Sequence, residues 1–213
     1  MSKPKLIIID CDGVLYHPSE LDVNAMLTAF NKVCDEFHIT DEKFIINGGK
    51  IETKSIGGSY NHILSAANKA NITPTAFINK VIGFINYSNI SADKCDVLEL
   101  LHKTSQKYKV CICTNNTLPH VNKVLKARFN IDTSQLPFEV FDATFAEKDG
   151  IYYPKQSDVF IKKLEQHFGL NAHDFFWIDD DPTVTNAVTK QDCDFALVTD
   201  KYLLTDILNN LLR

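Results

Sequence analysis

The stretch Leu6-Ile7-Ile8-Ile9-Asp10-Cys11-Asp12-Gly13-Val14-Leu15-Tyr16 decides how this chain folds. Its four consecutive Leu and Ile residues are typical of a parallel strand that is covered on both faces. Asp10, Asp12 and Gly13 cannot continue such a strand, so it ends where two carboxylates begin. If the extended geometry persists through Asp12, the two-residue period places Asp10 and Asp12 on the same side. Paired carboxylates in a cleft attract a hard divalent cation.

A second apolar run, residues 108–114, ends in the hydroxyl of Thr114. Asn115 follows and leads into a helix that we expect to reach Phe129. The amides of a first helical turn and the Thr114 hydroxyl would point at an anion, helped by the helix dipole. The end of this run therefore predicts an anion site at Thr114 and Asn115, and an ordinary helix cap is the alternative.

A third apolar run, residues 175–178, ends in Asp179, Asp180 and Asp181. Three adjacent carboxylates repel one another, so their place after a buried strand is costly unless a cation compensates. A simple acidic turn is the weaker explanation. The sequence leaves open which of the three carboxylates would bind a metal directly.

Strands and helices alternate along most of the chain, with a short strand near residues 137–145, a final strand near 195–198 and a helix from about Leu203. This alternation predicts an α/β fold with a parallel sheet and right-handed crossovers. Ligands of such sheets bind beyond the carboxyl ends of the strands. The three polar strand ends are therefore expected to meet at one place.

The region between Tyr16 and Ser91 has a helical pattern and no strong strand. Apolar residues recur with a period near 3.6 at 22–37, at 60–67 and, after Pro74, at 77–85. The glycine pairs in this region are expected to form plain turns between short helices. A further helix is predicted over 91–104.

Composition restricts the function classes. Hydrophobic residues make up 45% and charged residues 23% of the 213 residues, which is ordinary for a globular protein. The net charge is −5, so the chain lacks the positive surface potential that is typical of nucleic-acid-binding proteins. We therefore expect no nucleic-acid partner. No apolar segment suits a signal peptide or a membrane span, so we expect a cytoplasmic protein. Six scattered cysteines and seven scattered histidines give little support to a zinc site.

These motifs resemble those of the haloacid dehalogenase-like (HAD) superfamily. Asp10-Cys11-Asp12-Gly13-Val14-Leu15 is similar to its first motif, Thr114 to its second and Asp179-Asp180 to its fourth. Lys155, just before a predicted helix, is similar to the third, although Pro154 precedes the lysine where many members have proline after it. Lys148 is the alternative. The resemblance implies a Rossmann-like core of residues 1–16 and 91–213, with a helical cap, residues 17–90, inserted after the first strand.

The resemblance also implies a role for each site residue. The expected activity is Mg²⁺-dependent hydrolysis of a small phosphomonoester through an aspartyl-phosphate. The implied roles are nucleophile for Asp10, acid and base for Asp12, phosphate binding for Thr114 and Asn115, charge balance for Lys155, and Mg²⁺ binding for Asp10, the Asp12 carbonyl, Asp180 and Asp179.

A finer resemblance is to the pyrimidine 5′-nucleotidase-like phosphatases. It rests on the exact residues of the first motif, Asp10 to Tyr16, on the helical cap, on Tyr87 ahead of Asp93, and on Cys113-Thr114-Asn115-Asn116. This resemblance implies a nucleoside 5′-monophosphate as substrate, although the cap departs from the usual pattern of that group. A sugar phosphomutase and a non-catalytic regulatory binding protein with this fold are the alternatives. The sequence leaves the oligomeric state open.

Overall fold

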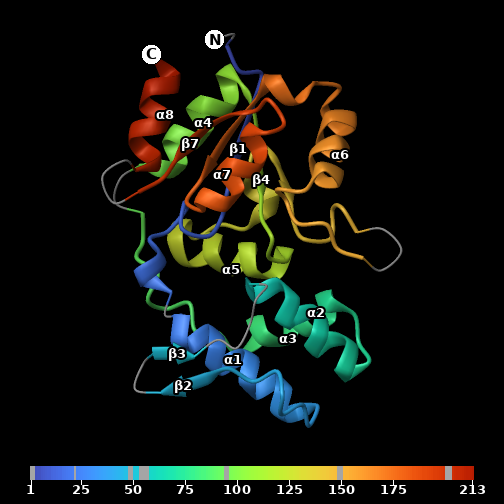
Figure 1. Ribbon diagram of the computed structural model, residues 1–213. Helices are drawn as coiled ribbons and strands as arrows, with labels where there is room; N and C mark the ends of the chain where they lie inside the picture. The colour runs from blue at the N-terminus through green and yellow to red at the C-terminus, as the bar shows by residue number, and fades with distance from the viewer. Residues whose placement is uncertain are drawn as a thin grey trace. The chain divides into compact units, whose positions relative to one another are not determined.

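The computed structural model describes residues 3–21, 23–47, 50–52, 58–93, 96–147, 151–199 and 203–213 (Figure 1). The chain divides into two compact units. The larger unit joins Met1–Pro18 to Ile90–Arg213, and the smaller unit is Ser19–Asn89. The smaller unit is thus inserted between the first strand of the larger unit and the rest of it.

A five-stranded parallel sheet forms the larger unit, with the strand order β5-β4-β1-β6-β7. The predicted α/β fold with a Rossmann-like parallel sheet is confirmed. The strands are β1 (Leu6–Ile9), β4 (Lys109–Cys113), β5 (Glu139–Phe141), β6 (Phe175–Asp179) and β7 (Asp194–Leu197). The helices of this unit are α4 (Val97–Lys107), α5 (Leu118–Phe129), α6 (Asp158–Phe168), α7 (Pro182–Thr189) and α8 (Leu204–Leu212), with 3₁₀ turns η2 (Thr133–Gln135) and η3 (Ala172–Asp174).

Strand β1 lies at the centre of this sheet because all four of its side chains are apolar and fully buried. Leu6 and Ile8 belong to one core cluster, which includes Trp177, Phe160 of α6 and Val184 of α7. The alternation of side chains directs Ile7 and Ile9 to the opposite face. Helices α6 and α7 therefore cover one face of the sheet, and α4, which packs on β4 and on α8, belongs to the other.

Local signals set the ends of the helices. Helix α6 begins after Ser157, whose hydroxyl accepts the Phe160 N–H at 3.2 Å, and ends at Gly169 in the left-handed conformation. Helix α4 begins at Val97, later than the predicted start at Ser91, because Asp96 has a φ of 53° and cannot belong to a helix. Among the described residues, every helix is too short or too polar to cross a lipid bilayer.

Three helices and a two-stranded antiparallel sheet form the smaller unit. They are α1 (Val23–Glu36), α2 (Gly58–Ala70), α3 (Pro74–Phe84), β2 (Ile45–Asn47) and β3 (Lys50–Glu52), and the 3₁₀ turn η1 (Pro18–Glu20) precedes α1. The core of this unit is aromatic, because the Phe30 ring lies 5.0 Å from the Phe44 ring and 5.3 Å from the Phe77 ring, between centroids. Thr73 caps α3, and Pro74 occupies its first turn as predicted.

The prediction that this region holds helices and no strand was wrong for β2 and β3. Asn47 pairs with Lys50, and Gly48-Gly49 stands between these two residues in the sequence. A Gly-Gly pair between two short isoleucine-containing segments is a known hairpin signal. Those two glycines themselves lie outside the described residues. The signal was present, but three-residue strands are too short to give a clear alternation.

The packing of α6 against the sheet generates a test of stability. Phe160 is fully buried, whereas its neighbour Val159 is 39% exposed. We expect Phe160→Ala to lower the free energy of unfolding by about 3–5 kcal/mol and Val159→Ala to change it by less than about 0.5 kcal/mol. Trp177 is the sole tryptophan of the chain and lies in the same cluster, so its fluorescence during urea denaturation reports on this core. Equal losses in the two variants would contradict the packing described.

Candidate active site

Polar side chains lie at, or directly after, the carboxyl ends of three adjacent strands. Ile9 of β1 is paired with Ile112 of β4 and with Ile178 of β6. The Asp10 N–H donates to the carbonyl of Ile178 at 2.9 Å, so Asp10 stays beside β6 after β1 has ended. Asp10, Thr114 and Asp179 therefore follow or end neighbouring strands at their carboxyl ends, where ligands of parallel sheets bind.

Lys155 joins two of these strand ends through buried ion pairs. Its Nζ lies 2.6 Å from Asp10 Oδ1 and 2.8 Å from Asp179 Oδ2, and the residue is 3% exposed. Burial lowers the pKa of Lys155, but the carboxylates of Asp10 and Asp179 outweigh this effect and raise its pKa above the ordinary value. Lys155 therefore carries a positive charge at neutral pH. The alternative, Lys148, lies outside the described residues.

One lysine does not balance the carboxylates gathered here. Oxygen atoms of Asp10, Asp179 and Asp180 lie within 4.8 Å of one another. Burial raises the pKa of Asp10 well above its usual value and Asp179 adds to the rise, while Lys155 opposes it. Burial and then Asp179 raise the pKa of Asp180 to about 6. Three carboxylates and one ammonium leave an excess of negative charge, which a cation would relieve.

Gly13 allows Asp180 to approach this cluster. Its φ is +73°, and a Cβ atom at this position would lie 2.0 Å from Oδ2 of Asp180. Both the left-handed backbone and the lack of space therefore require glycine. The Asp-x-Asp-Gly pattern thus reflects contact between the turn after β1 and the turn after β6.

The Asp12 carboxylate is surrounded by hydrogen-bond donors. Its Oδ1 accepts from Tyr16 Oη at 2.5 Å and lies 2.6 Å from Nε2 of His120, while Oδ2 accepts from Asn116 Nδ2 at 2.7 Å and lies 3.4 Å from Thr114 Oγ1. Burial raises the pKa of Asp12, but the contact with His120 and the other hydrogen bonds outweigh it and hold the pKa below its ordinary value. Asp12 is therefore ionised.

The position of the Asp12 side chain is not set by the alternation of a β-strand. Strand β1 ends at Ile9, and residues 11–15 form a turn in which the Leu15 N–H donates to the Cys11 carbonyl at 3.0 Å. The condition that extended geometry persists through Asp12 is thus not met. The turn directs Asp12 toward the residues after β4 instead.

Three residues in contact with Asp12 were missed by sequence reasoning: Tyr16, Asn116 and His120. Asn116 and His120 are 104 and 108 positions away from Asp12, and only the fold brings them together. The available signal was a histidine at the third position of a helix that follows a polar strand end, although such a residue is more often a surface residue. Tyr16 is only 4 positions from Asp12 but resembles an ordinary core residue in the sequence.

Thr114 and Asn115, the two residues predicted to bind an anion, differ in their burial and in their hydrogen-bond partners. Thr114 is fully buried, and its hydroxyl accepts the Asn116 N–H at 3.0 Å. The Asn115 side chain accepts the Lys155 N–H at 2.8 Å and donates to Gln156 Oε1 at 3.3 Å. Asn115 therefore holds the turn that presents Lys155.

A cavity of about 450 Å³ opens onto this edge of the sheet. Thr114 and Asp179, among the predicted site residues, lie behind its wall. The residues that line it are Asp10, Asp12, Asn115, Lys155, Asp180, Asp181, Pro182 and Val184. The cavity therefore presents carboxylates, an amide and one ammonium to the same space.

A second set of possible metal ligands consists of Cys11, Asp12 and His120, whose ligand atoms also lie within 4.8 Å of one another. Burial, followed by the charges of Asp12 and Asp10, raises the pKa of the Cys11 thiol well above its usual value. A protonated thiol is a poor metal ligand. The 2.6 Å contact between Asp12 and His120 is therefore interpreted as a hydrogen bond.

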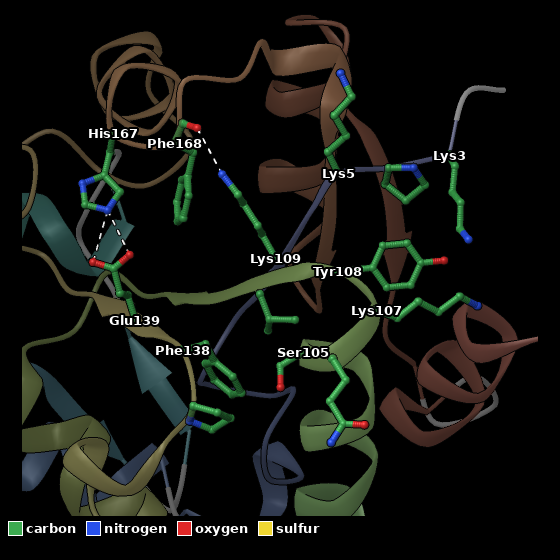
Figure 2. Close-up of a pocket in the computed structure, with 14 residues that line it drawn as sticks. Lys3, Lys5, Ser105, Lys107, Tyr108, Lys109, Phe138, Glu139, His167 and Phe168 are labelled. Carbon is green, nitrogen blue, oxygen red and sulfur yellow. Dashed lines mark hydrogen bonds and ion pairs between the residues drawn. The ribbon is translucent and has the colours of Figure 1, made fainter.

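A larger cavity of about 920 Å³ lies at the opposite, amino ends of β1 and β4 (Figure 2). It is basic, but two of its lysines are engaged with helix ends: Lys109 donates to the Phe168 carbonyl at the end of α6 (Figure 2), and Lys107 donates to the Leu211 carbonyl of α8. Cations at helix C-termini complement the helix dipole. Lys5 is paired with Asp174 at 3.0 Å, and Lys3 lies over the Tyr108 ring. The lysines of this cavity thus have structural partners.

Comparisons with known proteins agree with this geometry. A family model for haloacid dehalogenase-like hydrolases matches residues 4–185. No curated protein matches the chain significantly.

Several solved structures share the fold. The HAD family enzyme BT-2542 from Bacteroides thetaiotaomicron, solved with magnesium and inorganic phosphate, is 16% identical with a TM-score of 0.53, over 92% of this chain and 94% of that chain. A mutant of CbbY from Rhodobacter sphaeroides, in complex with xylulose-(1,5)bisphosphate, is 12% identical with a TM-score of 0.59, over 94% and 88%. The defluorinating L-2-haloacid dehalogenase Rha0230 is 11% identical with a TM-score of 0.53, over 99% and 96%.

The solved structures at these identities establish the fold alone, whereas the family model extends over most of the chain and includes each of the strand ends described above. The resemblance of the strand-end motifs to this superfamily is thereby confirmed, and the chain belongs to the haloacid dehalogenase-like hydrolases.

Proposed function

We propose that this chain is a Mg²⁺-dependent phosphomonoester hydrolase that acts through an aspartyl-phosphate intermediate. The observation that carries the proposal is the position of Asp10, a buried carboxylate at the end of the central strand, paired with Lys155 and open to the 450 Å³ cavity. The magnesium, inorganic phosphate and sugar bisphosphate in the solved BT-2542 and CbbY structures support this choice of chemistry.

The residues present fit a magnesium ion. Asp10, Asp179 and Asp180 supply carboxylate oxygens within 4.8 Å of one another, which is the donor type that Mg²⁺ prefers. We assign the ion to Asp10 and Asp180, with the Asp12 carbonyl and help from Asp179. When bound, Mg²⁺ would offset the repulsion between these carboxylates and a phosphate.

Asp10 is the nucleophile of the proposed reaction. Its carboxylate attacks phosphorus, a bond forms between an Asp10 oxygen and phosphorus, and the bond between phosphorus and the ester oxygen breaks. Asp12 gives a proton to the departing alcohol and then takes one from the water that hydrolyses the aspartyl-phosphate. Asp12 is ionised without substrate, and a phosphate dianion placed beside it would favour the protonated form that this step needs.

Lys155, Thr114 and Asn115 complete the proposed phosphate site. The Lys155 ammonium faces the cavity and balances negative charge on the transferring phosphoryl group. The Asn115 amide lines the same cavity. Thr114 is buried behind it, and we assign its hydroxyl to a phosphoryl oxygen that reaches the end of β4.

The second carboxylate, Asp12, favours phosphoryl chemistry over carbon–halogen hydrolysis. The family includes dehalogenases such as Rha0230, so the fold does not decide between the two reactions. A phosphate ester needs an acid for its alcohol leaving group, whereas a halide leaves without a proton. Asp12 lines the cavity beside Asp10, which suits the former.

We propose a compact phosphomonoester as substrate, with nucleoside 5′-monophosphates as the first class to test. The basis is the resemblance of the motifs to pyrimidine 5′-nucleotidase-like phosphatases, and we assign the segment of residues 17–90 as the cap that selects the leaving group. A phosphate-release screen over nucleotides, sugar phosphates and p-nitrophenyl phosphate tests this. An isomerised sugar phosphate among the products would instead identify a phosphomutase.

Removal of the nucleophile gives the first test of activity. We expect Asp10→Asn to lower kcat by at least about a hundredfold, because the amide cannot form the phosphoryl bond. The matched control is Asp192→Asn, an exposed turn residue at a φ of 68°, which asparagine tolerates. Phosphate release with Mg²⁺ present is the measurement, and wild-type turnover by purified Asp10→Asn would refute the mechanism.

The choice between Lys155 and Lys148 gives a second test. Lys155→Gln leaves the buried carboxylates of Asp10 and Asp179 without their ammonium, so we expect both activity and stability to fall, the latter by about 3–5 kcal/mol at neutral pH. Lys148→Gln should change neither. Urea denaturation and phosphate release on both variants decide the assignment, and the reverse pattern would transfer the role to Lys148.

Asp180 gives a test through metal and pH. Its carboxyl holds a proton more tightly in the folded protein, with a pKa of about 6, than at the ordinary value of 3.8. The metal-free protein should therefore lose stability as the pH rises from about 4 to about 6, because the unfolded chain releases that proton first. Asp180→Asn removes this loss and should match or exceed wild-type stability at neutral pH.

With magnesium bound, we expect the wild type to be more stable than Asp180→Asn, the reverse of the order expected without metal. Ligand binding at a hundredfold excess over Kd stabilises a protein by about 2.7 kcal/mol, so Mg²⁺ should raise the melting temperature of the wild type and have a smaller effect on Asp180→Asn. Thermal unfolding with EDTA and with Mg²⁺ measures both effects. An identical Mg²⁺ response in the two proteins would remove Asp180 from the metal site.

A further inference from the structure

His120 is a buried neighbour of Asp12, the proposed acid and base. Its Nε2 lies 2.6 Å from Oδ1 of Asp12, and the side chain is fully buried. It lies on the first turn of α5, the helix that follows β4 directly. We assign the hydrogen of this contact to His120 Nε2, because a carboxylate oxygen is the acceptor in such a pair.

Four side chains contact the carboxylate of Asp12. Tyr16 and His120 approach Oδ1, and Asn116 and Thr114 approach Oδ2. Asp12 belongs to a turn and not to the sheet, so its backbone lacks the fixed geometry of the strand that presents Asp10. Its side-chain orientation therefore depends on these donors.

The two donors to Oδ1 come from different kinds of structure. The imidazole of His120 belongs to a helix and is buried, whereas Tyr16 belongs to the segment that leaves the larger unit for the smaller one. A buried polar group is retained where it finds a partner, because burial without one costs free energy. His120 pairs with Asp12 and is not among the residues that line the 450 Å³ cavity, so the contact with Asp12 is the one through which we expect it to act.

We propose that His120 is the positioning residue of Asp12: its Nε2–H fixes the carboxylate so that the proton of Asp12 is aimed at the oxygen of the leaving alcohol. The inference rests on the proposed phosphatase function. Loss of this hydrogen bond leaves Asp12 chemically intact but less well oriented. Small misplacements of a catalytic group can cost about a hundredfold in rate.

The identity of the leaving group separates positioning from a general structural role. An alkyl phosphate needs a proton on its leaving oxygen, whereas the p-nitrophenolate of p-nitrophenyl phosphate departs without one. For kcat/KM, which reports the steps up to formation of the aspartyl-phosphate, only the alkyl substrate depends strongly on the acid. A misaligned Asp12 should therefore affect the two substrates unequally.

The experiment compares two substitutions that differ in the N–H donor. His120→Leu fills the buried space without a donor, and His120→Gln supplies an amide N–H in its place. We expect His120→Leu to lower kcat/KM for the best alkyl phosphate of the screen at least about tenfold more than for p-nitrophenyl phosphate. His120→Gln should recover most of this difference. If His120→Leu does not fold, His120→Met, with its adaptable apolar side chain, replaces it.

A double-mutant cycle completes the test. In an Asp12→Asn background, His120→Leu should cause no further loss with the alkyl phosphate, because the residue acts only through Asp12. Equal losses for both substrates, or additive losses in the cycle, would overturn the inference, as would turnover of p-nitrophenyl phosphate alone by the wild type. A wild type that hydrolyses neither substrate would instead refute the proposed function itself.

Discussion

The buried ion pairs of Lys155 with Asp10 and Asp179 are the constraint on which the larger unit depends. They tie the ends of β1 and β6 to the turn before α6, at 2.6 and 2.8 Å. Burying two carboxylates away from water costs desolvation free energy, and their attraction to a single ammonium offsets this cost only in part. The strands around them are apolar and closely packed, so these charges meet solvent only through the cavity at the ends of the strands.

The same constraint explains the shape of the neighbouring turns. Gly13 is required because Asp180 approaches the turn after β1, and Asn115 is required because its amide holds the N–H of Lys155. The carboxylates of the site thus repel one another, and a bound cation would relieve this repulsion. This arrangement of charges therefore favours a protein that is more stable with the cation than without it.

The sequence was informative where one strand carries both the packing and the chemistry. Leu6–Ile9 is apolar because it is central and buried, and the change to Asp10 marks the end of the strand, so strand and site could be predicted together. The same reasoning applies to Asp179 at the end of β6 and to Thr114 after β4. The parallel order of the strands then follows from the alternation with helices.

The sequence was uninformative where contacts depend on tertiary structure. Asn116 and His120 reach Asp12 across more than a hundred positions of the chain, and no periodic pattern encodes that contact. Strands β2 and β3 have three residues each, too few to show alternation. The start of α4 depends on the left-handed conformation of Asp96, which helix propensity does not reveal.

The most direct measurement of the central claim is the chemical state of Asp10 during turnover. Enzyme mixed with p-nitrophenyl phosphate and Mg²⁺, quenched in acid within the first turnover and digested, should contain a peptide that carries one phosphoryl group on Asp10. Asp12→Asn should accumulate more of it, because this leaving group needs no acid whereas hydrolysis of the intermediate needs the base. Full turnover with Asp10 unmodified at every quench time, or a phosphoryl group on another residue, would contradict the account.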